Sequence, residues 1–91
     1  MAAYENLAAS YDRLTNDVDY QATVDFYREI LNREGLRPRT AVDLACGTGS
    51  VSVLLAKAGL GVTGVDMSEE MLTMAQQKAQ DLENPPQFVC Q

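Results

Sequence analysis

One short stretch of the sequence, VDLACGTGSVSVLLA at residues 42–56, constrains the fold more than any other. An apolar run of strand length, residues 40–45, stops at Cys46-Gly47-Thr48-Gly49, here called the glycine turn, and a second apolar run follows. Glycine has no Cβ, so the backbone can turn with positive φ and a ligand can approach the peptide plane closely. The stretch predicts a strand and a helix joined by a turn that either receives a ligand or serves only to reverse the chain.

The rest of the sequence continues the alternation of strands and helices. In chain order, the expected elements are helices at residues 4–14 and 20–31, a strand at 40–45, a helix at 49–58, a strand at 62–65, a helix over 69–82 with Ser68 as its N-cap, and a strand at 88–90. Gly35 is the expected stop of the second helix. Strands alternating with helices form a parallel sheet through right-handed crossovers, so we expect an α/β fold with strand order 3-2-1.

Asp66 and the glycine turn are expected at the same edge of this sheet. Both follow a strand directly, and ligands of parallel sheets bind beyond the carboxyl ends of the strands. An acid at the end of the second strand is placed to accept hydrogen bonds from a ribose diol; the alternative is a carboxylate that caps a helix or faces solvent. Together with Gly47 and Gly49, Asp66 predicts a ligand that contains a nucleoside.

The residues around the turn indicate which nucleoside. A dinucleotide fingerprint requires a third glycine at position 52, where this chain has Ser52, and no Gly-Lys-Ser/Thr follows to make a P-loop. Asp43, in the strand before the turn, suits a cationic or amino group better than a pyrophosphate. Its alternative role is to accept hydrogen bonds from the backbone N–H groups of the turn itself.

The segment resembles the class I S-adenosylmethionine-dependent methyltransferases. Their first motif, acidic-x-Gly-x-Gly-x-Gly, matches residues 43–49, with Ala45 in place of the first glycine, and their second motif matches Val62 to Asp66. The resemblance implies a partial Rossmann-like methyltransferase fold and S-adenosylmethionine as the cofactor. It also implies a cofactor-binding set, namely Asp43, Ala45, Cys46, Gly47, Gly49, Asp66, Met67 and Tyr20.

Several members of this set have ordinary alternatives. Met67 is expected to lie against the adenine, with Met71 as a second candidate, although both also suit packing on a helix face. The helical start resembles the segment that folds over the cofactor in such enzymes, where Tyr11 or Tyr20 would reach the cofactor carboxylate; packing within a helix is the other role. We assign no chemistry to the Cys46 thiol.

We therefore expect residues 1–38 to form a helical segment over the cofactor and residues 39–91 to form the first β-α-β-α-β part of a truncated methyltransferase domain. The expected function is S-adenosylmethionine binding within an enzyme that methylates a small molecule, and no catalytic residue is assigned. The alternatives are an NAD-type dinucleotide-binding fragment and a non-catalytic oligomerising fragment. We also expect the chain alone to be inactive and to self-associate along the strand at residues 40–45.

Charge and composition narrow the classes of partner. Seven basic and thirteen acidic residues give a net charge of -6, and no Lys/Arg cluster is present, which disfavours binding to nucleic acid or to an anionic membrane. The sequence has no histidine, and its two cysteines lack the spacing of a zinc site, so no metal site is expected. No membrane-spanning segment or signal peptide is expected, which favours a cytoplasmic protein.

Overall fold

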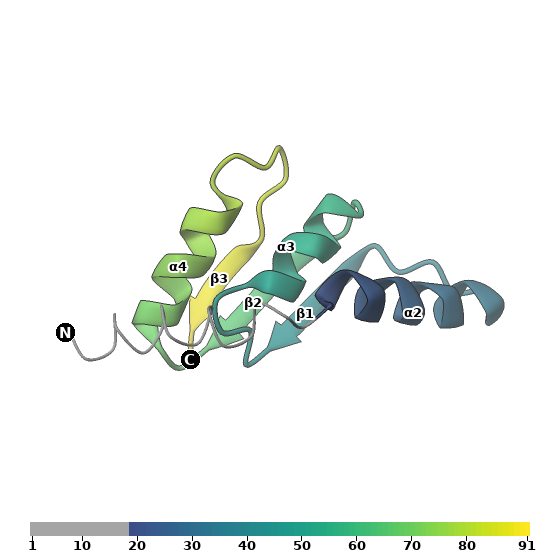
Figure 1. The fold of residues 1–91 in the computed structure, drawn as a ribbon, viewed down its shortest axis with the longest axis horizontal. Coiled ribbons are helices and arrows are strands. Elements are labelled where there is room, and N and C mark those ends of the chain that lie inside the picture. Colours follow the sequence, from purple (N-terminus) through teal and green to yellow (C-terminus); the bar gives the residue numbers. More distant parts are fainter. Residues whose placement is uncertain (1–18) are drawn as a thin grey trace.

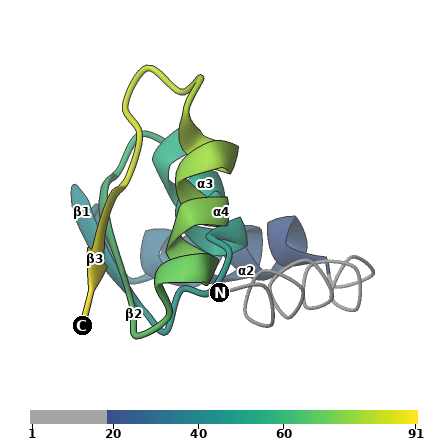
Figure 2. The same ribbon diagram turned by 90° about the vertical axis from the view of Figure 1, so that its left-hand side faces the viewer.

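The computed structural model describes residues 19–91, which form a three-stranded parallel sheet with helices packed on one of its faces (Figures 1 and 2). In chain order the elements are α2 (Tyr20–Arg33), β1 (Thr40–Leu44), α3 (Ser50–Lys57), β2 (Gly61–Asp66), α4 (Glu69–Ala79) and β3 (Gln87–Cys90). The predicted α/β class and the strand order are confirmed. The helix expected at residues 4–14, with Tyr11, lies outside the described residues.

The sheet has one covered face and one open face. Its strands lie in the order β1-β2-β3, with β1 and β3 as the edges. The register pairs Val42 with Thr63 and Leu44 with Val65, so these four side chains project from the same face. Figure 2 shows α3 and α4 on the opposite face. Because no helix of the described residues covers the first face, Val42 is 65% exposed and Leu44 is 74% exposed.

Local signals in the sequence explain where the helices begin and end. Asp19 caps α2 by accepting a hydrogen bond from the backbone N–H of Ala22 at 2.8 Å. Ser68 caps α4 in the same way, with Met71 as the donor at 3.2 Å. Gly35 follows α2 with a φ of 72°, as expected of a helix stop. The expectation that α4 extends to Leu82 is wrong, since the helix ends at Ala79 before the turn that leads to Pro85 and Pro86.

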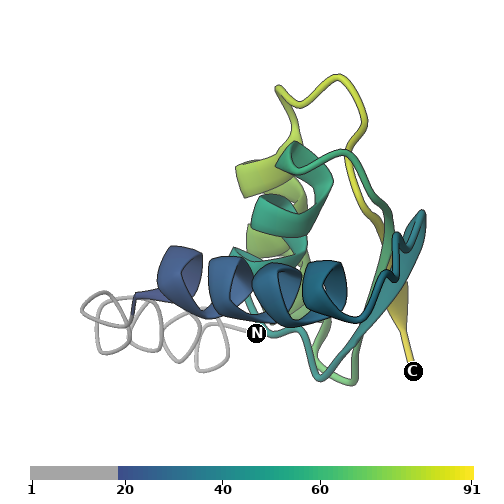
Figure 3. The same ribbon diagram turned by 90° about the vertical axis from the view of Figure 1, so that its right-hand side faces the viewer.

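The core lies between the helices and the covered face of the sheet. Its buried apolar side chains near the sheet are Val53, Ala56, Val62, Leu72, Ala75 and Ala79. Helix α3 contacts both α2 and α4 and lies between them, as Figures 1 and 3 show. None of the helices in residues 19–91 is long and apolar enough to span a bilayer.

Candidate functional site

The glycine turn and the residues after β2 lie together at the carboxyl edge of the sheet, the lower edge in Figure 1. The backbone N–H of Cys46 donates to the carbonyl of Val65 at 2.9 Å, which extends the pairing of β1 and β2 beyond the last residue of β1. The N–H of Gly49 donates to the carbonyl of Cys46 at 3.0 Å and closes the turn. The prediction that the turn and the end of β2 meet at one edge is confirmed.

The backbone before and within the turn has an unusual series of positive φ angles. Gly47 has a φ of 57° and Gly49 a φ of 81°, which explains the glycines by conformation alone. Ala45, which stands where the resembling motif has a glycine, also has a positive φ, at 54°. This left-handed conformation costs an alanine roughly 1 to 2 kcal/mol. The departure from the motif therefore stores strain directly beside the turn.

Steric crowding is a second reason why position 49 requires a glycine. A Cβ at this position would lie 2.8 Å from the Cβ of Ala75 in α4 and 3.4 Å from the ring of Phe88 in β3. The turn thus packs directly on α4, and Gly49 has a role in packing that needs no ligand. Its contact with a cofactor stays a prediction.

Asp66 joins the two segments of the site. Its Oδ2 accepts the backbone N–H of Gly47 at 2.8 Å, and its Oδ1 accepts the backbone N–H of Ser68 at 2.9 Å. The carboxylate therefore holds the glycine turn and the start of α4 together. An oxygen of an ionised carboxylate can accept two hydrogen bonds, and each oxygen of Asp66 accepts one from the backbone donors named here. Both oxygens therefore retain the capacity to accept a hydrogen bond from a ligand hydroxyl. The two alternative roles of this residue, ligand binding and a structural contact near a helix start, are compatible.

Asp43 has a partner that the sequence did not indicate. The hydroxyl of Ser52 donates to Asp43 Oδ2 at 2.7 Å, and Ser52 is completely buried. Ser52 stands at the position where a dinucleotide fingerprint has its third glycine, and its side chain binds Asp43. A hydroxyl residue one helical turn after the glycines is the signal that could have predicted this pair.

The Cys46 thiol lies among acidic groups at the carboxyl edge. Burial raises its pKa to about 11, and the nearby carboxylates of Asp43 and Asp66 contribute to the rise. Because the thiolate is the reactive form, Cys46 is a neutral and unreactive thiol near pH 7. Within residues 19–91, no group of three His, Cys, Asp or Glu side chains is placed to hold a metal ion.

A second glycine makes room for the side chains beneath the turn. A Cβ on Gly64 would lie 2.8 Å from the ring of Phe88 and 3.0 Å from the sulfur of Cys46. The Phe88 ring therefore lies over Gly64 and reaches as far as Gly49. It supports the turn from the third strand, a role that no local pattern in the sequence indicates.

The remaining predicted residues have less defined positions. Met67 directly follows Asp66 and is 83% exposed, which leaves its side chain available at the carboxyl edge and argues against the packing alternative. Met71 is half-buried in the first turns of α4. Tyr20 is the first residue of α2 and is half-buried, and no hydrogen bond joins it to the turn in the described part of the chain. Contacts of Met67 and Tyr20 with a cofactor stay predictions.

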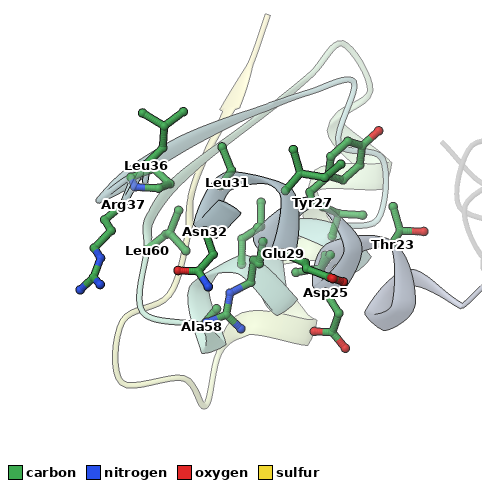
Figure 4. Close-up of a pocket in the computed structure, with 16 residues that line it drawn as sticks. Thr23, Asp25, Tyr27, Glu29, Leu31, Asn32, Leu36, Arg37, Ala58 and Leu60 are labelled. Atoms are coloured by element: carbon green, nitrogen blue, oxygen red, sulfur yellow. The ribbon is translucent and has the colours of Figure 1, made fainter. Parts of the chain in front are cut away.

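A cavity of about 1030 Å³ lies elsewhere, between α2 and α3 (Figure 4). Apolar side chains of Tyr27, Leu31 and Leu36 line it, together with Val51 and Leu55 of α3. None of the predicted cofactor residues is part of its lining. The cavity and the carboxyl edge are therefore separate features.

Comparison with known proteins identifies the family to which this chain belongs. Residues 41–91 match the family described as a methyltransferase domain. A putative methyltransferase of Geobacillus sp. (strain WCH70) is 45% identical over 78 residues, which cover 85% of this chain and 32% of that protein. The chain spans about a third of the length of the curated relatives it matches.

Two solved structures agree with this match. An S-adenosylmethionine-dependent methyltransferase from Clostridium acetobutylicum ATCC 824 superposes with a TM-score of 0.78 at 34% identity, over 98% of this chain and 37% of that one. Magnesium protoporphyrin IX methyltransferase from Synechocystis PCC 6803, solved with bound SAM, superposes with a TM-score of 0.63 at 43% identity, over 78% of this chain and 36% of that one.

Proposed function

Because the chain belongs to the class I S-adenosylmethionine-dependent methyltransferases, we propose that the edge formed by the glycine turn and Asp66 binds S-adenosylmethionine, and that the protein methylates a small molecule. The observation that carries the proposal is the hydrogen bond from the Gly47 N–H to Asp66 Oδ2 at 2.8 Å. It places a carboxylate directly beside the backbone of Gly47, where no Cβ stands between the peptide and a ligand.

The residues of the edge fit the chemistry of this cofactor. Asp66 would accept the ribose hydroxyls on the acceptor positions that its two backbone donors leave. Asp43, oriented by Ser52, would face the amino group of the methionine part, since a carboxylate pairs with a cationic amine. Met67 would offer an apolar side chain to the adenine, for which its 83% exposure leaves it available.

When bound, S-adenosylmethionine supplies an electrophilic methyl group on a sulfonium. The residues of this chain would contribute by binding and orienting, which is the main source of rate in a direct transfer between two bound molecules. The Cys46 thiol at this edge is not expected to react with the methyl group. With its pKa raised to about 11, the thiol stays protonated and is a poor nucleophile beside a reactive methyl group.

The proposed acceptor is a small molecule. One solved structure that resembles this chain at 43% identity is an enzyme named for magnesium protoporphyrin IX, which is such an acceptor. The net charge of -6 and the absence of a Lys/Arg cluster argue against a nucleic-acid acceptor, because binding to phosphates requires basic side chains.

The dinucleotide alternative loses its support at position 52. The third glycine of that fingerprint allows close packing of the helix, whereas Ser52 here is buried and bound to Asp43. Isothermal titration of the protein with S-adenosylhomocysteine and with NAD separates the two functions. We expect S-adenosylhomocysteine to bind more tightly, and tighter binding of NAD would overturn the proposal.

A further inference from the structure

The side chain of Lys78 reaches from α4 to the glycine turn. Its Nζ donates to Thr48 Oγ1 at 2.9 Å and to Ser50 Oγ at 3.3 Å. Thr48 is the middle residue between the two positive-φ glycines and is 1% exposed, and Ser50 is the first residue of α3. A single ammonium group therefore holds the turn at its centre and at its exit, from a helix 28 to 30 residues further along the chain.

A second residue of α4, Ala75, also contacts the turn. Ala75 precedes Lys78 by three residues, so the two side chains lie on the same side of α4. Ala75 fills the space where a Cβ of Gly49 would be, at 2.8 Å. The contact at Gly49 prevents the turn from moving toward α4, and the hydrogen bonds of Lys78 prevent it from moving away.

The start of α4 is tied to the turn as well, through Asp66 and its bonds to Gly47 and Ser68. The turn is thus held at Gly47 by Asp66 of β2, and it is contacted at Thr48 and Gly49 by Lys78 and Ala75 of α4. A bound ligand that contacts this backbone is oriented by it. A displacement of the turn by about 1 Å would therefore misplace the ligand enough to lower the rate of a reaction severely.

We propose that Lys78 is a positioning residue for the cofactor: it fixes Thr48 and Ser50, and thereby the backbone of the glycine turn, without binding the cofactor itself. This inference rests on the proposed function. It assigns this role to a residue that is itself exposed to solvent.

The test compares Lys78→Met, which removes the donor, with Lys78→Arg, which keeps a charged donor. Lys57→Met is the matched control, since Lys57 is an exposed lysine at the end of α3. We expect Lys78→Met to weaken S-adenosylhomocysteine binding about tenfold, the effect of lowering the population of the binding-competent turn to about a tenth. Lys78→Arg should restore most of the affinity, and Lys57→Met should bind as the wild type does.

Thr48→Val tests whether Lys78 acts through Thr48. In that background Lys78→Met should weaken binding much less than it does in the wild type, because the main acceptor is already absent. Equal affinity of the wild type and Lys78→Met, or full additivity of the two substitutions, would overturn the inference.

A second readout needs no ligand. Amide hydrogen exchange at Gly49 in the free protein should be faster in Lys78→Met than in the wild type, and unchanged in Lys57→Met. If the wild type binds no S-adenosylhomocysteine while exchange at Gly49 responds to Lys78, the proposed function fails and the positioning of the turn stands. Unchanged exchange at Gly49 contradicts the positioning role directly.

Discussion

Asp66 Oδ2 accepts the backbone N–H of Gly47 at 2.8 Å, across 19 residues of sequence. This bond connects the ends of two neighbouring strands, and the second oxygen of the same carboxylate accepts the N–H of Ser68 at the start of α4. One side chain therefore fixes the distance between the glycine turn and the segment that begins α4. The arrangement makes Asp66 both a structural residue and the main candidate for ligand recognition.

Gly49→Ala should destabilise the fold. The new Cβ meets Ala75 at 2.8 Å and the residue has a φ of 81°, so steric overlap adds to conformational strain. We expect a loss of about 2 to 4 kcal/mol in the free energy of unfolding, from overpacking together with the left-handed backbone.

Gly35→Ala is the control for this substitution. Gly35 has a similar φ of 72° but nothing within 4 Å of its would-be Cβ, so it should show only the conformational cost, about 1 to 2 kcal/mol. Chemical denaturation measures both variants. Equal losses in the two would show that the contact of the turn with α4 contributes nothing.

Ser52→Ala should affect both stability and binding. It removes the donor that bonds Asp43 Oδ2 at 2.7 Å and leaves a half-buried carboxylate without that partner. We expect a loss of about 1 to 2 kcal/mol in unfolding free energy and weaker S-adenosylhomocysteine binding. Thr73→Ala, which removes an exposed hydroxyl of α4, provides the comparison. Wild-type affinity in Ser52→Ala would mean that Asp43 needs no orientation by Ser52.

The Cys46 thiol should titrate late. Its pKa of about 11 lies above the value of 9.0 for a free thiol, so the folded protein retains a proton that the unfolded chain loses between pH 9 and 11. The thiol therefore favours the folded state below pH 9, and this contribution declines as the pH rises toward 11. The rate of alkylation at Cys46, followed by peptide mass spectrometry, should increase with an inflection near pH 11 when folded and near pH 9 in denaturant. An inflection near 9 in the folded protein would exclude the proposed environment.

Self-association through β1 remains a proposal for this chain. β1 is an edge of the sheet in the described structure, and its exposed Val42 and Leu44 add apolar surface beside unpaired backbone groups. We expect a second copy to pair along β1, so that sedimentation velocity at micromolar concentration shows a dimer or larger species. Val42→Lys should shift the population toward the monomer, because a charge on an edge strand opposes pairing. A wild-type monomer at all concentrations would contradict this proposal.

The sequence predicted those parts of the site that depend on local signals. The strand ending at the glycine turn, the strand ending in Asp66 and the caps at Gly35 and Ser68 all follow from periodicity and from residues that favour one conformation. The contacts across the site were not predictable in the same way. Lys78 reaches Thr48 across 30 residues, and such a contact depends on how α4 packs on the sheet.

The pair of Ser52 and Asp43 lies between these cases. Their separation of nine residues crosses the turn, so their contact depends on its geometry, which the positive φ angles at Ala45, Gly47 and Gly49 determine. The left-handed conformation of Ala45 could not be predicted from the sequence, because alanine adopts this conformation only at an energetic cost. Periodicity does not predict the end of α4 either, because Leu82 continues the apolar spacing although the helix ends at Ala79.

Calorimetric titration with S-adenosylhomocysteine is the direct test of the proposal that the carboxyl edge around Asp66 binds S-adenosylmethionine. The wild type should bind, and Asp66→Ala should weaken binding by about 1 to 3 kcal/mol, the scale for hydrogen bonds to a charged group. Asp81→Ala, which removes an exposed acid after α4, should bind as the wild type does. Circular dichroism verifies that each variant is folded. Unchanged affinity in a folded Asp66→Ala variant would show that the Asp66 carboxylate does not bind the cofactor.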